Sequence, residues 1–198
     1  MKRLVIVMTV AALALAGCGG EAVVPQGQGA HGHDASSAAP PAAGARFNDT
    51  DVVFVQMMVD HLQLGISLSQ VALSKATSQE AKDLAGAIDV TQREELDMLK
   101  SWLKLWDKPE GDGASLHAAH GGEPLLDAAV IDDTKNQSGA EFDATFLNLM
   151  AGHQGSAVEM ALKEQKEGSN PEATAYAERV VTTRQGQVQQ MLKIISQS

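Results

Sequence analysis

The sequence predicts an all-α protein, an up-down-up-down four-helix bundle built from two helix-hairpin repeats joined by a long loop. Three observations predict it. Apolar residues recur at three- and four-residue steps through four long segments, which is the period of an amphipathic helix. No alternating strand pattern competes with this period. A motif, Phe-x3-Met-x-x-His, occurs twice at a spacing of 92 positions, which indicates an internal duplication.

The duplication places a thioether and an imidazole side by side in each half, because positions i+4 and i+7 share one helix face. The repeated residues are Phe54, Met58 and His61 in the first copy and Phe146, Met150 and His153 in the second. Farther along, Met98-Leu99-Lys100 matches Met191-Leu192-Lys193 at a spacing of 93, which predicts that one residue was gained or lost within the repeat. The period exceeds that of solenoid repeats, so the two copies should form one domain.

The N-terminus has the features of a secreted, lipid-anchored protein. Met1-Lys-Arg is followed by an apolar run, Leu4 to Ala16, that is too short to span a membrane. Leu15-Ala16-Gly17-Cys18 resembles the bacterial lipobox, in which the cysteine becomes the lipidated first residue. Residues 1–17 are therefore predicted to be a lipoprotein signal peptide. The expected location is the cell envelope on the periplasmic or extracytoplasmic side, and the outer membrane in a Gram-negative source.

Composition limits the function classes. The formal net charge is −10, which becomes about −12 once Lys2 and Arg3 are removed, and no basic stripe is present, so nucleic acid is not an expected partner. Cys18 is the only cysteine, which excludes disulfides and thiolate metal sites. Residues 18–46 are rich in Gly, Ala, Pro and Ser and are predicted to be a flexible tether. Within this tether, His31 and His33 could hold a metal loosely or could be incidental.

The bundle domain is predicted over 47–198, with repeat one at about 48–108. Asn48-Asp-Thr-Asp51 supplies N-cap candidates for a first helix over 49–76. Thr77-Ser-Gln-Glu80 has the pattern of a capping box that opens a second helix, and Pro109 stops that helix.

A glycine-rich loop is predicted at about 109–138, with one short helical turn in the apolar patch from Leu125 to Ile131. Repeat two, at about 139–197, starts with a second capping box, Ser138-Gly-Ala-Glu141, and its first helix should end at Gly168 in a left-handed conformation. Asn170-Pro171 is an N-cap followed by proline at the first helical position, so the last helix starts there.

The duplicated motif, with Gln92-x5-Met98 and Gln185-x5-Met191 downstream, resembles the bacterial domain-of-unknown-function family numbered 305. The resemblance extends from about Asn48 to Ser196. It implies a ferritin-like four-helix bundle, export from the cytoplasm, and the copper or silver binding found in some members.

This sequence departs from the family motif at the second histidine. The usual motif is Met-x-x-His-His, followed by Gly-Ala and by a methionine seven residues after the first histidine. Here Leu62 and Gln154 replace the second histidine, and the later methionine is present as Met160 but is Leu68 in the first copy.

The sequence predicts one metal site in the bundle core. In an up-down-up-down bundle the first and third helices are parallel and diagonal, so the two motifs would meet at the same depth. Two thioethers and two imidazoles suit Cu(I) or Ag(I) better than Mg²⁺, Ca²⁺ or Mn²⁺. The predicted ligands are Met58, His61, Met150 and His153, with Met57 and Met160 as possible additions and Asp60 and Gln154 as groups that could orient the imidazoles. Core methionines and buried histidines are also ordinary packing residues.

His117 and His120 lie in the long loop, where they could form an accessory metal site near His31 and His33 or could be solvated. Enzyme activity is not expected. A di-iron oxidase needs Glu-x-x-His on paired helices, and the sequence contains neither this motif nor a Gly-x-Ser-x-Gly motif or a phosphate-binding loop.

The leading hypothesis is a lipid-anchored envelope protein that binds Cu(I) or Ag(I) for sequestration or delivery. The alternative is a metal-free helical interaction module at the envelope, in which the histidines and methionines are core residues.

Overall fold

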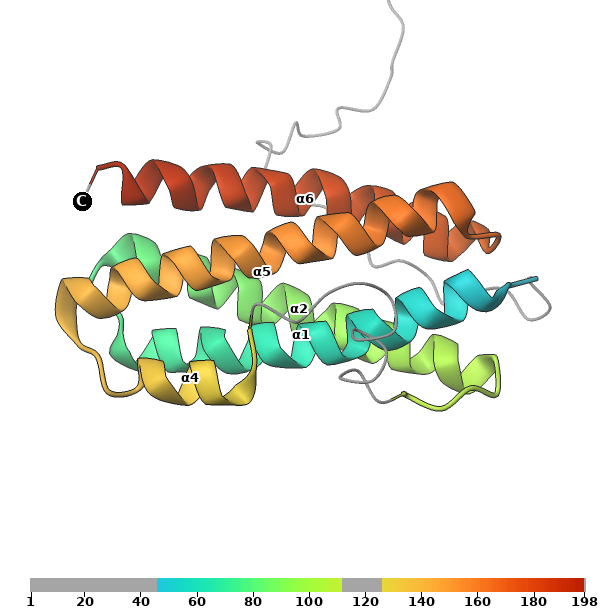
Figure 1. Ribbon diagram of the computed structural model, residues 1–198, viewed down its shortest axis with the longest axis horizontal. Coiled ribbons are helices and arrows are strands. Elements are labelled where there is room, and N and C mark those ends of the chain that lie inside the picture. The colour runs from blue at the N-terminus through green and yellow to red at the C-terminus, as the bar shows by residue number, and fades with distance from the viewer. Residues whose placement is uncertain (1–45, 112–125, 198) are drawn as a thin grey trace, which may run out of the picture. The chain divides into compact units, whose positions relative to one another are not determined.

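A computed structural model describes residues 46–111 and 126–197 of the chain. These residues form α1 (Asp49–Lys75), α2 (Gln79–Leu105), the short α4 (Ala128–Thr134), α5 (Gly139–Glu167) and α6 (Pro171–Ile195), as Figure 1 shows. The two described ranges contain no strand. The expectation of an all-α four-helix bundle is therefore confirmed.

The helix starts follow the sequence signals, with one shift. Asn48 caps α1 in a reciprocal capping box with Asp51. The cap of α2 is Ser78 rather than Thr77, because the Ser78 side chain accepts a hydrogen bond from the Ala81 amide. Asn170 caps α6, and proline follows at the first helical position, as predicted.

The second hairpin differs from the expected capping in two places. Ser138 occupies the N-cap position of α5, but its side chain makes no capping hydrogen bond. The C-cap of α5, Gly168, is extended at φ −69° and ψ 157°, so the predicted left-handed stop is wrong. A Cβ at Gly168 would collide with the Glu164 carboxyl, which explains why this position suits glycine.

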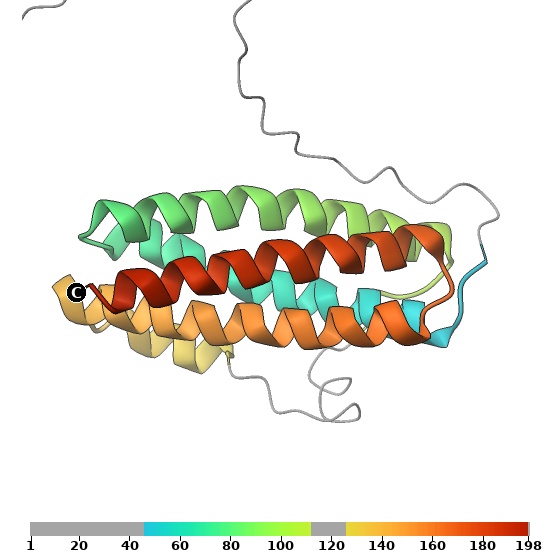
Figure 2. The ribbon, with the colours of Figure 1, turned by 90° about the horizontal axis from the view of Figure 1, so that it is seen from above.

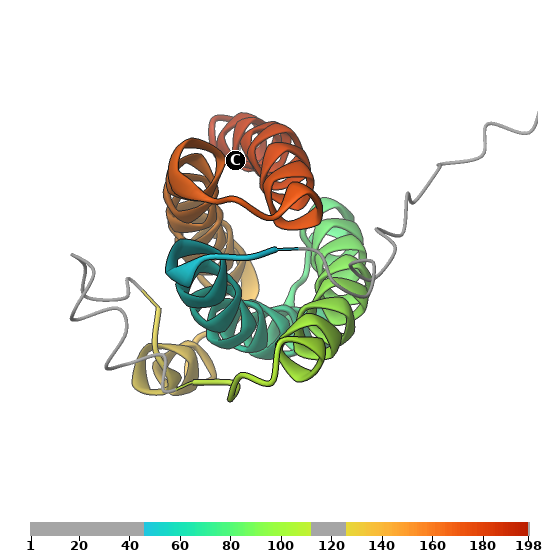
Figure 3. The ribbon, with the colours of Figure 1, turned by 90° about the vertical axis from the view of Figure 1, so that its right-hand side faces the viewer.

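The direction of α5 differs from the prediction. Helix α2 ends at one end of the bundle, and α5 begins at the other end, where α1 ends (Figure 1). In Figure 2, α6 lies between α2 and α5, and the end-on view of Figure 3 shows a ring in the order α1, α2, α6, α5. Thus α1 and α5 are antiparallel neighbours. The predicted up-down-up-down order, with parallel and diagonal first and third helices, is wrong.

Hydrogen bonds at both ends of the bundle show the same arrangement. We call Asp51 and Asp143 the bridging aspartates; they are equivalent in the two repeats. Asp51, in the first turn of α1, accepts hydrogen bonds from the amides of Ser169 (3.0 Å) and Asn170 (2.9 Å) in the α5–α6 turn. Each bridging aspartate therefore joins the start of one hairpin to the turn of the other.

Asp143, in the first turn of α5, makes the equivalent contacts to the α1–α2 turn. It accepts hydrogen bonds from the Thr77 amide (2.9 Å), the Thr77 hydroxyl (2.8 Å) and the Ser78 amide (2.7 Å). Burial alone would raise the pKa of Asp143, but these bonds outweigh it and lower that pKa below its ordinary value.

Most buried positions of the second hairpin correspond to buried positions of the first at a constant spacing of 92. Six buried residues of α2 have buried equivalents in α6: Ala81 and Ala173, Leu84 and Tyr176, Ala85 and Ala177, Ile88 and Val180, Gln92 and Arg184, and Leu99 and Met191. The prediction of a gained or lost residue is therefore wrong. Gln185, which the spacing of 93 paired with Gln92, is exposed.

The apolar core forms two clusters with a polar layer between them. One cluster contains Met58, Trp102 and Tyr176, and the other contains Phe146 and Met150. The buried polar residues Gln92, His153 and Arg184 lie in sequence between members of the two clusters. By length and composition α1 could cross a membrane, but most of its apolar window is buried, as expected of a core helix in a bundle.

Candidate metal centre

The two repeated histidines meet in the middle of the bundle. The rings of His61 on α1 and His153 on α5 stack with their centroids 3.6 Å apart and their planes within 3° of parallel. The side chains are 4 % and 3 % exposed. Because α1 and α5 are antiparallel and cross at equivalent positions, the duplication places one histidine directly against the other.

The stack restricts how the two imidazoles could share a metal ion. A nitrogen lone pair lies in the plane of its ring, and these two planes are nearly parallel. The lone pairs therefore do not converge on one point between the rings. Both nitrogens could bind a single ion only if one ring rotated out of the stack.

The two thioethers lie on opposite sides of the histidine pair. Met58 and Met150 are buried, at 1 % and 0 % exposed, but they belong to different apolar clusters. Each precedes its own histidine by one helical turn, a rise of about 4.5 Å. In antiparallel helices these steps lead in opposite directions, so the structure brings the imidazoles together and leaves one thioether on each side of them.

The other predicted ligands and orienting residues do not belong to the histidine stack. Met57 and Met160 are partly exposed, and Met160 packs against the cluster that contains Met58. The Gln154 amide donates a hydrogen bond to Gln187 Oε1 of α6 at 2.8 Å, which ties it to that helix. Asp60 is partly buried beside His61 in the sequence. Cys18, His31, His33, His117 and His120 lie outside the described residues.

Gln92, which was not among the predicted ligands, belongs to the polar layer. Its side chain is fully buried, and neither amide atom makes a hydrogen bond within the described part of the chain. A Cβ at Gly65 would collide with Gln92 Oε1 and would lie 2.8 Å from His153 Nε2. A sequence signal was available, because Gln92 stands in the apolar stripe of its helix between Ile88 and Leu99.

Arg184, the equivalent of Gln92 in the second repeat, forms an ion pair within the polar layer. Arg184, 1 % exposed, pairs with Glu95 of α2 and donates to Gln187 Oε1 at 3.3 Å. The Tyr176 hydroxyl also donates to Glu95, at 3.3 Å. Burial raises the pKa of the Glu95 carboxyl, although the charge of Arg184 acts in the opposite direction. The pair contributes a fixed cation and its counter-charge to the polar layer.

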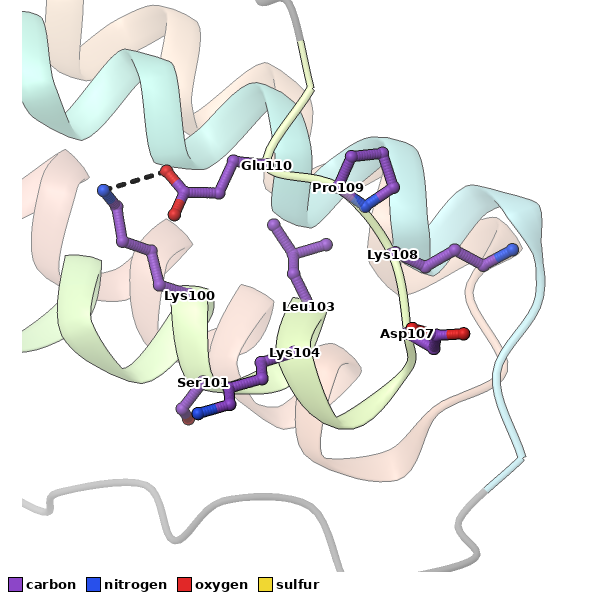
Figure 4. Close-up of a pocket in the computed structure, with 8 residues that line it drawn as sticks. All are labelled: Lys100, Ser101, Leu103, Lys104, Asp107, Lys108, Pro109 and Glu110. Carbon is purple, nitrogen blue, oxygen red and sulfur yellow. Dashed lines mark ion pairs between the residues drawn. The ribbon is translucent and has the colours of Figure 1, made fainter.

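Two surface hollows in the described part of the chain contain none of the predicted ligands. One hollow, at the end of α2, is drawn in Figure 4; a 2.9 Å ion pair joins its Lys100 and Glu110. Another lies between α1 and α4 and includes Leu64 and Ile131. Among the described residues, no three His, Cys, Asp or Glu side chains are grouped closely enough to hold a metal. A core site would therefore need thioether or amide donors beside the imidazoles.

Comparisons with known proteins identify relatives of the same fold. Two solved DUF305 structures resemble the chain: one from Streptomyces coelicolor (TM-score 0.70, 21 % identity, covering 75 % of this chain and 93 % of that one) and one from Deinococcus radiodurans (TM-score 0.66, 23 % identity, covering 80 % and 100 %). CopM in its Cu(I)-bound form is also similar (TM-score 0.63, 25 % identity, covering 76 % and 98 %). A search of curated proteins gave no match.

The model of the family described as "Domain of unknown function (DUF305)" matches residues 51–195, which include all four long helices except their outermost residues. This match covers well over half of the sequence and both copies of the duplicated motif. The protein therefore belongs to the DUF305 family.

Proposed function

We propose that this protein binds Cu(I) or Ag(I) at the cell envelope, for sequestration or delivery, through methionine and histidine side chains of the bundle core. The observation that carries the proposal is the buried His61–His153 pair, with a buried thioether one turn away on each helix. The similarity to CopM, which has been solved in Cu(I)-bound and silver-bound forms, supports it.

The donor set fits a soft monovalent ion. Thioethers and imidazoles are the ligands that Cu(I) prefers, whereas Mg²⁺ and Ca²⁺ require oxygen. Met58 and Met150 have long, unbranched side chains that can adjust to a ligand with little disturbance of the packing around them. The role that we propose is binding without catalysis.

The proposed location depends on the lipobox at Cys18. Acylation there would hold the domain at the outer face of a membrane through the N-terminal segment. Cys18→Ser should release the protein into the soluble fraction. If the variant still sediments with membranes after a salt wash, the lipoprotein proposal is wrong.

A metal-free interaction module is the second candidate, and one observation favours it. Met58 and Met150 each belong to a well-packed apolar cluster, as ordinary core methionines do. In this case the histidine stack would be a packing solution that was copied when the hairpin was duplicated, and the protein would act through a partner protein.

A Cu(I) competition titration separates the two functions. Residues 18–198 would be produced without acylation and titrated with Cu(I) against a coloured chelator. Met58→Leu and Met150→Leu conserve volume, so they should leave the Tm within a few degrees of the parent value. They should nevertheless weaken Cu(I) binding by about tenfold. Met98→Leu, in a partly buried methionine of α2, is the matched control. Absence of Cu(I) binding, or equal loss in all three variants, would favour the metal-free module.

A further inference from the structure

Gln92 has an amide group whose burial the fold does not explain. It is fully buried, and both its oxygen and its nitrogen make no hydrogen bond within the described residues. A buried polar group without a partner destabilises the folded state, so native proteins keep few of them. An apolar residue of similar size would fit the stripe formed by Ile88 and Leu99 without this cost. The amide is therefore a candidate for contact with a ligand.

The amide oxygen faces the same point as a histidine nitrogen. Gln92 Oε1 and His153 Nε2 both lie within 3 Å of the position that a Cβ of residue 65 would occupy. Residue 65 is glycine, which allows both polar atoms to approach the backbone of α1. An oxygen donor and a nitrogen donor thus meet beside one face of α1, at the edge of the histidine stack.

The equivalent position in the second repeat is different in both of its residues. Ala157, which carries a Cβ, corresponds to Gly65, and Arg184 corresponds to Gln92. The Arg184 guanidinium is buried and paired with Glu95. A fixed cation and a methyl group would disfavour a metal ion at that position. The duplicated core therefore has only one of its two equivalent positions open to a cation.

The donor types indicate which ion this position would accept. An imidazole nitrogen and an amide oxygen are suited to Cu(II), which binds most tightly among the common divalent first-row ions, whereas Cu(I) and Ag(I) favour thioethers. The lone pairs of the stacked rings do not converge on one ion. An ion bound to His153 Nε2 in this arrangement therefore needs its second ligand from a residue other than His61. We propose that Gln92 Oε1 and His153 Nε2 form a Cu(II)-binding subsite at Gly65, which lets the centre accept copper in both oxidation states. This inference rests on the proposed metal-binding function.

Gln92→Leu tests the subsite. The variant keeps the size of the side chain and removes the amide, so Cu(II) affinity, measured by competition and by electron paramagnetic resonance, should fall by about tenfold or more. Binding of Ag(I), which does not use the amide, should stay within about twofold of the parent value. In the metal-free protein the Tm should rise by about 2–4 °C, because an unpaired buried amide has been removed. A lower Tm would identify Gln92 as a structural residue and overturn the inference.

Gly65→Ala provides a second test that leaves the amide in place. Its Cβ would displace Gln92 Oε1 and His153 Nε2, so Cu(II) binding should weaken by about tenfold. Gly155→Ala is the matched control, because a Cβ there meets no atom within 4 Å. In Gln92→Leu, either unchanged Cu(II) affinity or equal losses of Cu(II) and Ag(I) affinity would overturn the subsite. Failure of the parent protein to bind Ag(I) and Cu(I) would instead overturn the proposed function.

Discussion

Replacement of Glu164 by glutamine should stabilise the metal-free protein at alkaline pH. Glu164 is fully buried near the end of α5. Burial raises the pKa of its carboxyl from 4.5 to about 9, and the neighbouring Asp51 adds to the shift. The folded chain therefore holds a proton that the unfolded chain releases above its ordinary pKa. The stability from this group is fully present below about pH 4.5 and is lost as the pH rises toward 9.

The change in the free energy of unfolding follows from the pH range between the unfolded and folded pKa values of Glu164. One proton taken up on folding changes stability by about 1.36 kcal/mol per pH unit, which amounts to about 5 kcal/mol between pH 4.5 and pH 8. The protein around a buried carboxylate relaxes and lowers the penalty for ionising it, so we expect about half of this, about 2–3 kcal/mol. Glu164→Gln has no proton to take up and keeps an N–H donor for Asp51. It should match the parent protein at pH 5 and exceed its stability at pH 8.

Urea unfolding at pH 5, 7 and 8 measures the difference. Glu167→Gln is the matched control, because it makes the same substitution at an exposed position on the same helix. The control should shift both ends of the pH range equally. If Glu164→Gln shows the pH dependence of the parent protein, Glu164 is ionised in the folded state and the reasoning fails.

Two further predictions concern the polar contacts that join the hairpins. Asp143→Ala removes three hydrogen bonds from the start of α2 and should cost about 2–4 kcal/mol in urea unfolding at pH 7. Because the pKa of Asp143 is lowered, its contribution is present above about pH 3.8 and is lost as the pH falls through the lowered value. The variant should therefore be less acid-sensitive than the parent, and an unchanged acid transition would contradict this. Arg184→Met leaves Glu95 buried without its counter-charge and should cost about 3–5 kcal/mol, whereas adding Glu95→Leu should restore most of the loss. Thermal unfolding of the single and double variants checks this, and a double variant less stable than Arg184→Met would refute it.

Much of the fold could be predicted because the local signals agree with one another. Helical periodicity, the Asn48 cap and the Asn170-Pro171 start each act within a few residues, and the structure confirms them. The repeat also predicted that His61 and His153 occupy equivalent places. Helix caps and helical periodicity depend on residues that are close together in the sequence, so they can be predicted from it.

The direction of α5 could not be predicted, because a long connection allows the next helix to begin at either end of a bundle. This direction decides whether Met58 and Met150 lie together or on opposite sides of the histidines. The bridging aspartates could have indicated it, since Asp51 and Asp143 are equivalent polar residues on otherwise apolar helix faces. Their partners, however, lie more than 60 residues away in the sequence.

The equivalence of Gln92 and Arg184 could not be predicted from the sequence. The match of Met98 with Met191 suggested a spacing of 93 and paired Gln92 with Gln185. The buried residues of α2 and α6 match at a spacing of 92, so Gln92 is equivalent to Arg184. The tripeptide match therefore indicated the wrong spacing, and the difference between Gln92 and Arg184 in the polar layer became visible only in three dimensions.

The central proposal is that one ring of the His61–His153 stack rotates so that both histidines bind one ion, and a double-mutant cycle of Ag(I) affinity tests it most directly. The parent protein, His61→Leu, His153→Leu and the double variant would be titrated with Ag(I), with far-ultraviolet circular dichroism to confirm that each is folded. We expect one ion per chain, loss of most of the affinity in either single variant, and little further loss in the double variant. Additive losses would show two independent sites, and unchanged affinity in the double variant would show that the histidine pair binds no metal.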